Sequence, residues 1–135
     1  MSVHTAPEIG DVIAGRYRIL ERLGHGATGV VFRAAQRALG REVALKILHP
    51  RIALDSGARA RFGREARVAS AFEHESAVDI YDFGEDGDVV YIAMELLEGH
   101  TLRRRMDGGA SMLLAELLDI AAQIADVLVT AHRLP

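Results

Sequence analysis

Three glycines, Gly24, Gly26 and Gly29, precede a lysine, Lys46, that stands inside an apolar run. Glycines let the backbone N–H groups of a loop approach phosphate oxygens closely, and a lysine within reach neutralises their charge. A glutamate, Glu65, falls in the apolar stripe of a predicted helix, where a carboxylate is costly unless a cation meets it. These residue types therefore predict a phosphate-binding loop with Lys46 held in place by Glu65.

An alternative interpretation leaves Glu65 in water at the edge of its stripe. The stripe is formed by residues spaced four and three apart, namely Ala58, Phe62, Glu65, Ala69 and Phe72. An exposed ion pair with Lys46 would contribute only roughly 0.2–1 kcal/mol. Such a small energy does not account for two charges inside apolar runs, so a functional role is favoured.

The residues after the glycines read as a strand. Val30, Val31 and Phe32 follow Gly29 directly, and β-branched and aromatic residues favour strands. In a dinucleotide-binding unit the glycines instead open a helix. The pattern therefore predicts a turn between two antiparallel strands, and it disfavours an oxidoreductase that binds a dinucleotide through these glycines.

The rest of the chain divides into alternating strand and helix patterns. Strands are predicted at residues 17–23, 30–35, 42–48, 78–83 and 89–95, and helices at 58–72, 101–106 and 111–132, the last capped by Ser111. The first three strands are expected to form a meander.

The order of a glycine-rich loop, the V-A-L-K strand segment at 43–46, the helix glutamate and the pair Met94-Glu95 resembles the N-terminal lobe of protein kinases, and most of all bacterial Ser/Thr kinases. The resemblance runs from about Gly10 to the last residue. It implies an α+β fold: a kinase-like N-lobe with a five-stranded antiparallel sheet and one main helix, followed by the first helices of the C-lobe. The implied domains are a flexible tail at 1–15, an ATP-binding N-lobe at 16–95, a connector at 96–100 and the start of an incomplete C-lobe at 101–135.

The resemblance also assigns roles to residues. It implies that Gly24, Gly26 and Gly29 cover the ATP phosphates, and that Lys46 contacts the α- and β-phosphates and pairs with Glu65. The adenine contacts that it implies are Leu23, Val31 and Ala44 as sandwiching side chains, Met94 as the gatekeeper, and the backbone of Glu95 and Leu97. For each apolar member, plain core packing is an equal alternative.

Two tripeptides imitate further kinase motifs. Residues 82–84 spell D-F-G, but they precede Met94, whereas the metal-binding tripeptide of the family follows the hinge and the catalytic loop. Residues 132–134 begin like H-R-D and lack the aspartate. The catalytic base and the Mg²⁺ ligands are therefore expected outside these 135 residues. We expect the ATP-binding portion of a kinase that transfers the γ-phosphoryl of MgATP to protein hydroxyls, inactive by itself.

The last predicted helix is apolar on most of its circumference. Its polar residues form one narrow stripe, Glu116, Asp119, Gln123, Asp126 and Thr130. Such a helix belongs inside a larger core, which the remainder of a C-lobe would supply. Three acidic residues argue against a membrane span.

Composition limits the remaining possibilities. A net charge of -3 argues against a nucleic-acid partner, and the absence of cysteine suits a reducing compartment. Residues 1–10 lack the features of a signal peptide, so a cytoplasmic chain is expected. The expected partners are ATP and a protein substrate that the remaining C-lobe would bind; the oligomeric state stays open. The alternative function is a non-catalytic nucleotide-binding or protein-interaction module on a kinase-like scaffold.

Overall fold

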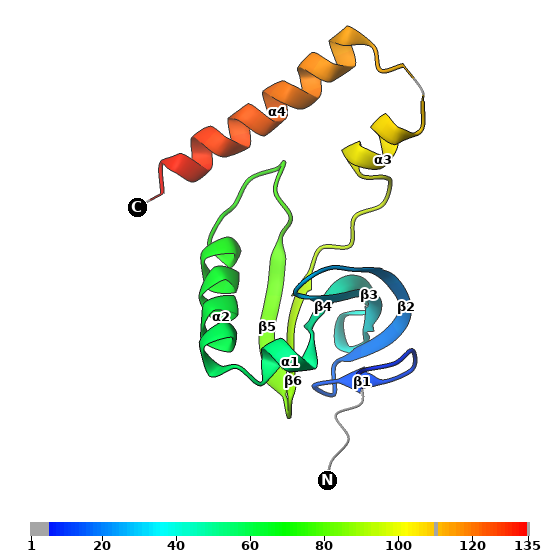
Figure 1. Ribbon diagram of the computed structural model, residues 1–135, viewed down its shortest axis with the longest axis vertical. Coiled ribbons are helices and arrows are strands. Elements are labelled where there is room, and N and C mark those ends of the chain that lie inside the picture. Colours follow the sequence, from blue (N-terminus) through cyan, green and yellow to red (C-terminus); the bar gives the residue numbers. More distant parts are fainter. Residues whose placement is uncertain (1–5, 110, 135) are drawn as a thin grey trace. The chain divides into compact units, whose positions relative to one another are not determined.

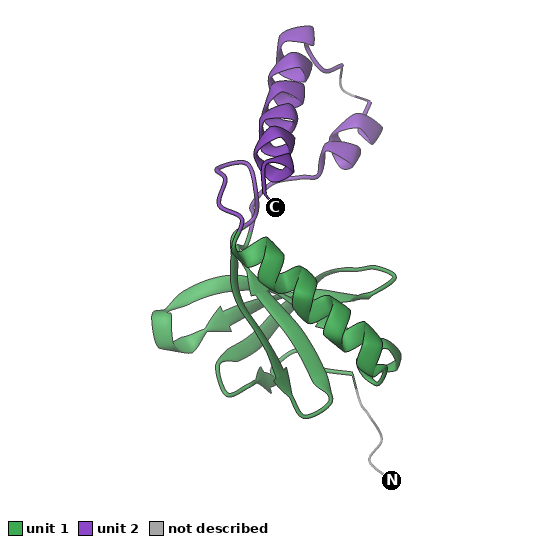
Figure 2. Cartoon of the chain, turned by 90° about the vertical axis from the view of Figure 1, so that its left-hand side faces the viewer, with its two compact units in different colours: residues 1–71, 79–96 green, residues 72–78, 97–135 purple. Residues whose placement is uncertain are grey.

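The computed structural model describes residues 6–109 and 111–134, which divide into two compact units (Figures 1 and 2). The first unit spans Met1–Ala71 and Asp79–Leu96, and the second spans Phe72–Val78 and Leu97–Pro135. The predicted N-lobe at residues 16–95 therefore differs from the first unit, because residues 72–78 join the second.

A six-stranded antiparallel sheet forms the first unit, in the order β1-β2-β3-β4-β6-β5 (Figure 1). Its strands are β1 (Val12–Ile13), β2 (Tyr17–His25), β3 (Gly29–Gln36), β4 (Arg41–Leu48), β5 (Ile80–Asp86) and β6 (Val89–Met94), with a 3-10 turn η1 (Arg37–Leu39) between β3 and β4. The predicted meander and the predicted hairpin of the last two strands are confirmed. The predicted count of five strands is wrong.

The sixth strand is β1, which lies in the segment predicted as a flexible tail. Val12 pairs with Arg18 and Ile13 pairs with Tyr17, and Ile13 is buried. Two residues are too few to show the alternation that marks a strand, so the pattern missed it. Residues 1–5 of the predicted tail lie outside the described part of the chain.

Both faces of the central strands are buried, because successive side chains of a strand point to opposite faces. Leu45 and Ile47 of β4 join one cluster together with Tyr17 and Tyr91, whereas Leu48 joins a second cluster. The second cluster contains Leu48, Ala53, Phe62, Ala66, Val90 and Ile92, drawn from β4, β6, α1 (Pro50–Ala53) and α2 (Ser56–Ser70). The helix α2 is thus held on the sheet by the second cluster.

Asp55 starts helix α2 by accepting a hydrogen bond from the Ala58 N–H at 2.8 Å. The buried face of the helix contains Phe62, Gly63 and Ala66. This differs from the predicted stripe, in which Glu65 and Ala69 were to face the core; both are exposed. Gly63 has no side chain, so the sequence pattern did not count it as part of the apolar face.

In the second unit, helix α3 (Leu102–Asp107) begins after Thr101, whose side chain accepts from the Arg104 N–H at 3.1 Å. Helix α4 (Leu114–His132) follows. Ser111 was predicted to cap it, but the capping position belongs to Leu113, whose backbone is extended and whose side chain makes no capping bond. The chain therefore enters the helix two residues later than predicted.

His74 joins the 72–78 segment to α4. Its Nε2 lies 2.9 Å from Oδ2 of Asp126, and its Nδ1 accepts from the Ser76 N–H at 3.0 Å. The ring of Phe72 stacks on the His74 ring with the centroids 6.2 Å apart. These contacts explain why residues 72–78 belong to the second unit.

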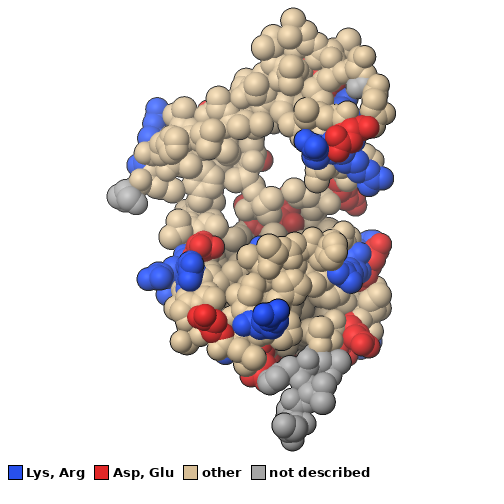
Figure 3. Space-filling view, in the orientation of Figure 1, with Lys and Arg blue, Asp and Glu red and all other residues tan. Residues whose placement is uncertain are grey.

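No described residue of α4 is buried. Its exposed large apolar side chains are Leu114, Leu117, Leu118, Ile124, Leu128 and Val129. On the face in Figure 3 much of the α4 surface carries no charged side chain. None of the helices in the described part of the chain has the length and apolar character needed to cross a membrane.

Candidate functional site

The structure places four of the predicted site residues on one face of the sheet. Val31 of β3 pairs with Lys46 of β4, and Ala44 of β4 pairs with Met94 of β6. Ala44 and Lys46 are two residues apart, so all four side chains share a face. Gly24 of β2 pairs with Val31 and adds the second strand of the hairpin to this group. We call these five residues the sheet-face site.

The three predicted glycines differ in what the fold requires of them. A Cβ at position 29 would overlap the carbonyl oxygen of Ile47 and lie 3.2 Å from the Leu48 Cα, so only glycine fits where the start of β3 pairs with the end of β4. Among the described residues, a Cβ at Gly24 or Gly26 would meet no atom within 4 Å. Packing therefore accounts for Gly29, whereas Gly24 and Gly26 leave the backbone open to a close approach from outside.

The structure does not bring Lys46 and Glu65 together. Among the described residues no ion pair joins them, and Glu65 is exposed. The Lys46 Nζ instead lies 5.8 Å from the centroid of the Phe62 ring. Phe62 faces Lys46 because α2 packs on the sheet through Phe62, Gly63 and Ala66, which turns Glu65 toward solvent.

The remaining predicted adenine contacts, Leu23, Glu95 and Leu97, lie outside the sheet-face site. Leu23 lies at a register shift between Arg22 and Gly24 and is 48% exposed. Glu95 follows β6, and its N–H donates to the Asp79 carbonyl at 2.9 Å. Leu97 belongs to the second unit and is exposed.

The D-F-G tripeptide at 82–84 belongs to β5, where its aspartate has structural partners. Asp82 Oδ2 accepts from the Tyr17 hydroxyl at 2.9 Å and lies 2.9 Å from an Arg16 nitrogen. Arg16 also donates to the Tyr91 hydroxyl at 2.7 Å. Burial, followed by the hydrogen bond to Asp82, raises the pKa of Tyr17 to about 12, and burial likewise raises the pKa of Tyr91. The network links β2 to β5, which are far apart in the sheet order.

Phe83 and Gly84 have packing roles in the same strand. The Phe83 ring lies 6.0 Å from the Phe62 ring, centroid to centroid. A Cβ at Gly84 would lie 2.8 Å from Cζ of Tyr91, so the glycine makes room for the buried tyrosine. All three residues of the tripeptide are therefore used by the fold of the first unit.

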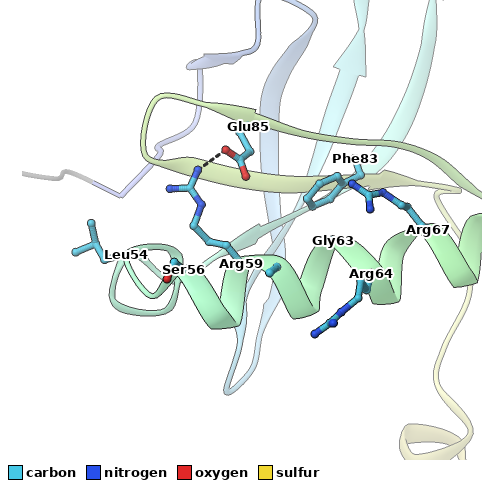
Figure 4. Close-up of a pocket in the computed structure, with 9 residues that line it drawn as sticks. Leu54, Ser56, Arg59, Gly63, Arg64, Arg67, Phe83 and Glu85 are labelled. Carbon is cyan, nitrogen blue, oxygen red and sulfur yellow. Dashed lines mark hydrogen bonds and ion pairs between the residues drawn. The ribbon is translucent and has the colours of Figure 1, made fainter.

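A pocket of about 520 Å³ lies between α2 and β5 (Figure 4). Figure 4 shows the Phe83 ring next to Gly63 and the ion pair between Arg59 and Glu85, while Arg64 points away from Phe83 on the other side of the helix. The ion pair and the ring contact fasten α2 to β5. The sequence pattern did not signal this pocket, because it joins residues on two elements that are separated along the chain.

The sequence matches the protein kinase domain over residues 17–134, and the chain belongs to this family. It is similar to the serine/threonine-protein kinase PrkC of Bacillus subtilis, with 42% identity over 125 residues that cover 93% of this chain and 19% of the relative. It is also similar to Pkn2 of Myxococcus xanthus, with 41% identity over 121 residues that cover 90% of this chain and 14% of the relative.

Solved structures agree with these relatives. The PknI kinase domain of Mycobacterium tuberculosis superimposes with a TM-score of 0.79 at 32% identity, covering 95% of this chain and 52% of that domain. The predicted family and the kinase-like α+β fold are confirmed. The chain spans about half the length of the solved kinase domain and about a fifth or less of the curated relatives.

Proposed function

We propose that this chain is the ATP-binding portion of a Ser/Thr protein kinase, whose complete domain transfers the γ-phosphoryl of ATP to protein hydroxyls. The observation that carries the proposal is the sheet-face site. Its five residues come from β2, β3, β4 and β6, yet the strand register places them on one face next to the glycine-rich loop. An apolar strand face beside a lysine and a glycine-rich loop suits a purine with attached phosphates.

The loop and Lys46 are suited to the phosphates. Gly24 and Gly26 have no packing reason to be glycine, so their absent side chains serve access to the backbone. Lys46 is the only lysine in a chain whose lysines and arginines number 16. A compact ammonium acts as a point charge on phosphate oxygens, whereas an arginine presents a planar fork with different geometry.

The adenine is proposed to lie on the apolar members of the sheet-face site, Val31 and Ala44, with Met94 at the end of β6. Ala44 is small and buried, and Met94 packs against the cluster that contains Phe62. Leu23, Glu95 and Leu97 remain proposed contributors on the strength of the family resemblance. The role of Glu65 as partner of Lys46 is proposed for the complete kinase domain, in a state in which α2 turns its exposed face toward the sheet.

The described residues do not fit a Mg²⁺ site. Residues 6–109 and 111–134 contain no group of three or more His, Asp or Glu side chains that could hold a metal ion. Asp82, the aspartate of the D-F-G tripeptide, is bound to Arg16 and Tyr17. We therefore propose that the catalytic base and the metal ligands come from the part of the kinase domain that this chain does not span, and that the chain alone transfers no phosphoryl group.

A single lysine allows a direct test of ATP binding. We expect MgATP to protect Lys46 from acetylation by an amine-reactive ester, read by mass spectrometry, because the bound phosphates cover the ammonium. The α-amino group at the chain start is an internal control and should stay unprotected. Equal acetylation of Lys46 with and without saturating MgATP would contradict the proposal.

Titration calorimetry gives the matched comparison. We expect Lys46→Ala to weaken MgATP binding by roughly ten- to hundredfold, since a hydrogen bond to a charged group contributes about 1.5–3 kcal/mol. Lys46→Arg keeps the charge and should bind with intermediate affinity. If Lys46→Ala binds MgATP as tightly as the unaltered chain, Lys46 does not contact the phosphates.

A further inference from the structure

The tip of the glycine-rich loop is attached to one residue at the end of β4, His49. The Nε2 of His49 lies 2.9 Å from the Gly26 carbonyl oxygen, and the His49 N–H donates to the Thr28 carbonyl at 3.0 Å. A carbonyl only accepts, so Nε2 carries the proton of the first bond. Within the loop, the Gly26 N–H donates to the Gly29 carbonyl at 2.9 Å. The same residue thus holds the loop from its side chain and from its backbone.

His49 itself has a fixed position. It follows Leu48, which is 3% exposed, and it is the capping residue of α1, with Pro50 at the first helical position. Its carbonyl accepts from the N–H groups of Ile52 and Ala53, each at 2.9 Å. The backbone of His49 is hydrogen-bonded through both its N–H and its carbonyl. The imidazole therefore extends from a fixed position and can orient the group that it binds.

The bond to Gly26 decides the direction of one peptide group. The peptide bond is planar and trans, so the Gly26 carbonyl and the Ala27 N–H point in opposite directions. Turning this peptide over changes ψ of Gly26 and φ of Ala27. Glycine accepts the new ψ without strain, so only the φ of Ala27 opposes the turn. A turned peptide would present its carbonyl oxygen where an anion needs an N–H group, and that oxygen repels phosphate.

We propose that His49 is a positioning residue for nucleotide phosphates, because it holds the Gly26 carbonyl and so keeps the Gly26–Ala27 peptide from turning its oxygen toward them. This inference rests on the proposed ATP-binding function. It predicts that His49 affects the binding affinity of ligands that carry phosphates and leaves the binding of the nucleoside alone unaffected.

Two substitutions separate the side-chain bond from the rest of the residue. His49→Gln places an amide N–H near the position of Nε2, whereas His49→Asn is too short to reach it. We expect His49→Asn to weaken MgATP binding roughly three- to tenfold, the range of one net hydrogen bond. His49→Gln should restore the affinity to within about twofold. Adenosine, which lacks phosphates, should bind all three chains alike in the same calorimetric assay.

Amide hydrogen exchange of the chain without nucleotide supplies a readout that does not depend on ATP binding. The Gly26 N–H should exchange faster in His49→Asn than in the unaltered chain, and at the original rate in His49→Gln. Equal MgATP affinity in all three chains, an equal loss for adenosine, or no rescue by glutamine would each overturn the inference. If the unaltered chain binds no MgATP, the proposed function fails. Unchanged exchange of the Gly26 N–H in His49→Asn would be a separate result, and it would show that the His49 side chain does not hold the loop.

Discussion

Phe83 rests its ring on helix α2 at Gly63, where a Cβ would lie 3.1 Å from Cζ of the ring. Glycine inside a helix costs about 1 kcal/mol relative to alanine, so its presence in α2 needs a reason. The ring contact provides one: it lets α2 approach β5 closely. The same contact sets the rotation of α2 that buries Phe62 and exposes Glu65.

The contact predicts that Gly63→Ala stabilises a Phe83→Leu chain more than the unaltered chain. In the unaltered chain, Gly63→Ala gains helix propensity but pushes against the ring, so the free energy of unfolding should change by less than about 1 kcal/mol. In a Phe83→Leu chain the obstacle is gone, and Gly63→Ala should stabilise by about 1 kcal/mol. Urea unfolding of the four chains measures the cycle. The same gain in both backgrounds would show that the ring does not restrict the helix.

Alanine should destabilise the chain strongly at Gly29 and hardly at all at Gly26. Gly29→Ala places a Cβ against the Ile47 carbonyl, a backbone obstacle, so we expect a loss of about 3 kcal/mol or more in unfolding free energy. Gly26→Ala meets no protein atom, so its stability should change by less than about 0.5 kcal/mol. Gly26→Ala should nevertheless weaken MgATP binding, measured by calorimetry. A stable Gly29→Ala chain would disprove the packing argument.

Glu65 should matter little to ATP binding by this chain. It forms no ion pair with Lys46, so Glu65→Gln should lower the MgATP affinity by less than about twofold, within the range of an exposed charge. Lys46→Ala is the comparison, with its larger loss. An equal loss in both variants, measured by calorimetry, would mean that the pair forms when ATP binds and that α2 turns with it.

The raised pKa of Tyr17 predicts a loss of stability at alkaline pH. The pKa of Tyr17 is about 12 in the folded chain, above the ordinary value of 10.0. As the pH rises, the Tyr17 hydroxyl therefore loses its proton in the unfolded chain before it does so in the folded chain. The contribution of this group to the free energy of unfolding is complete below pH 10.0 and is lost as the pH rises toward about 12. Urea unfolding from pH 8 upward should show this decline, and Tyr17→Phe should show a smaller one. Identical pH profiles for the two chains would contradict the assignment.

The sequence predicted the elements that repeat over several residues. The β3 and β4 strands run for eight residues each and contain apolar and β-branched runs, and the family order of glycines, Lys46 and Met94 pointed to the residues of the sheet-face site. Strand β1 was not predicted, because a strand of two residues shows no alternation. Helix α1 was missed for the same reason, since it has four residues and begins at Pro50.

The missed parts of the site depend on contacts between distant segments. The rotation of α2 follows from the position of Phe83, which lies 20 residues after Gly63 and on another element. The bond from His49 to the loop joins residues 23 positions apart, and a single histidine before a proline carries no period or motif. Nor does the pattern show that Tyr17 and Tyr91 meet at Asp82, although buried tyrosines are expected to find a hydrogen-bond partner.

The network around Asp82 has a mechanical consequence for the loop that follows β2. The base of β2 is fixed at Tyr17, whereas the pairing with β3 loses register twice before Gly24, between Ile19 and Glu21 and between Arg22 and Gly24. Register shifts bend a strand and leave part of its ladder unpaired. The strand ladder therefore holds the outer half of β2 less firmly than its base, and the bonds from His49 to the carbonyls of Gly26 and Thr28 supply a second anchor at the glycine tip.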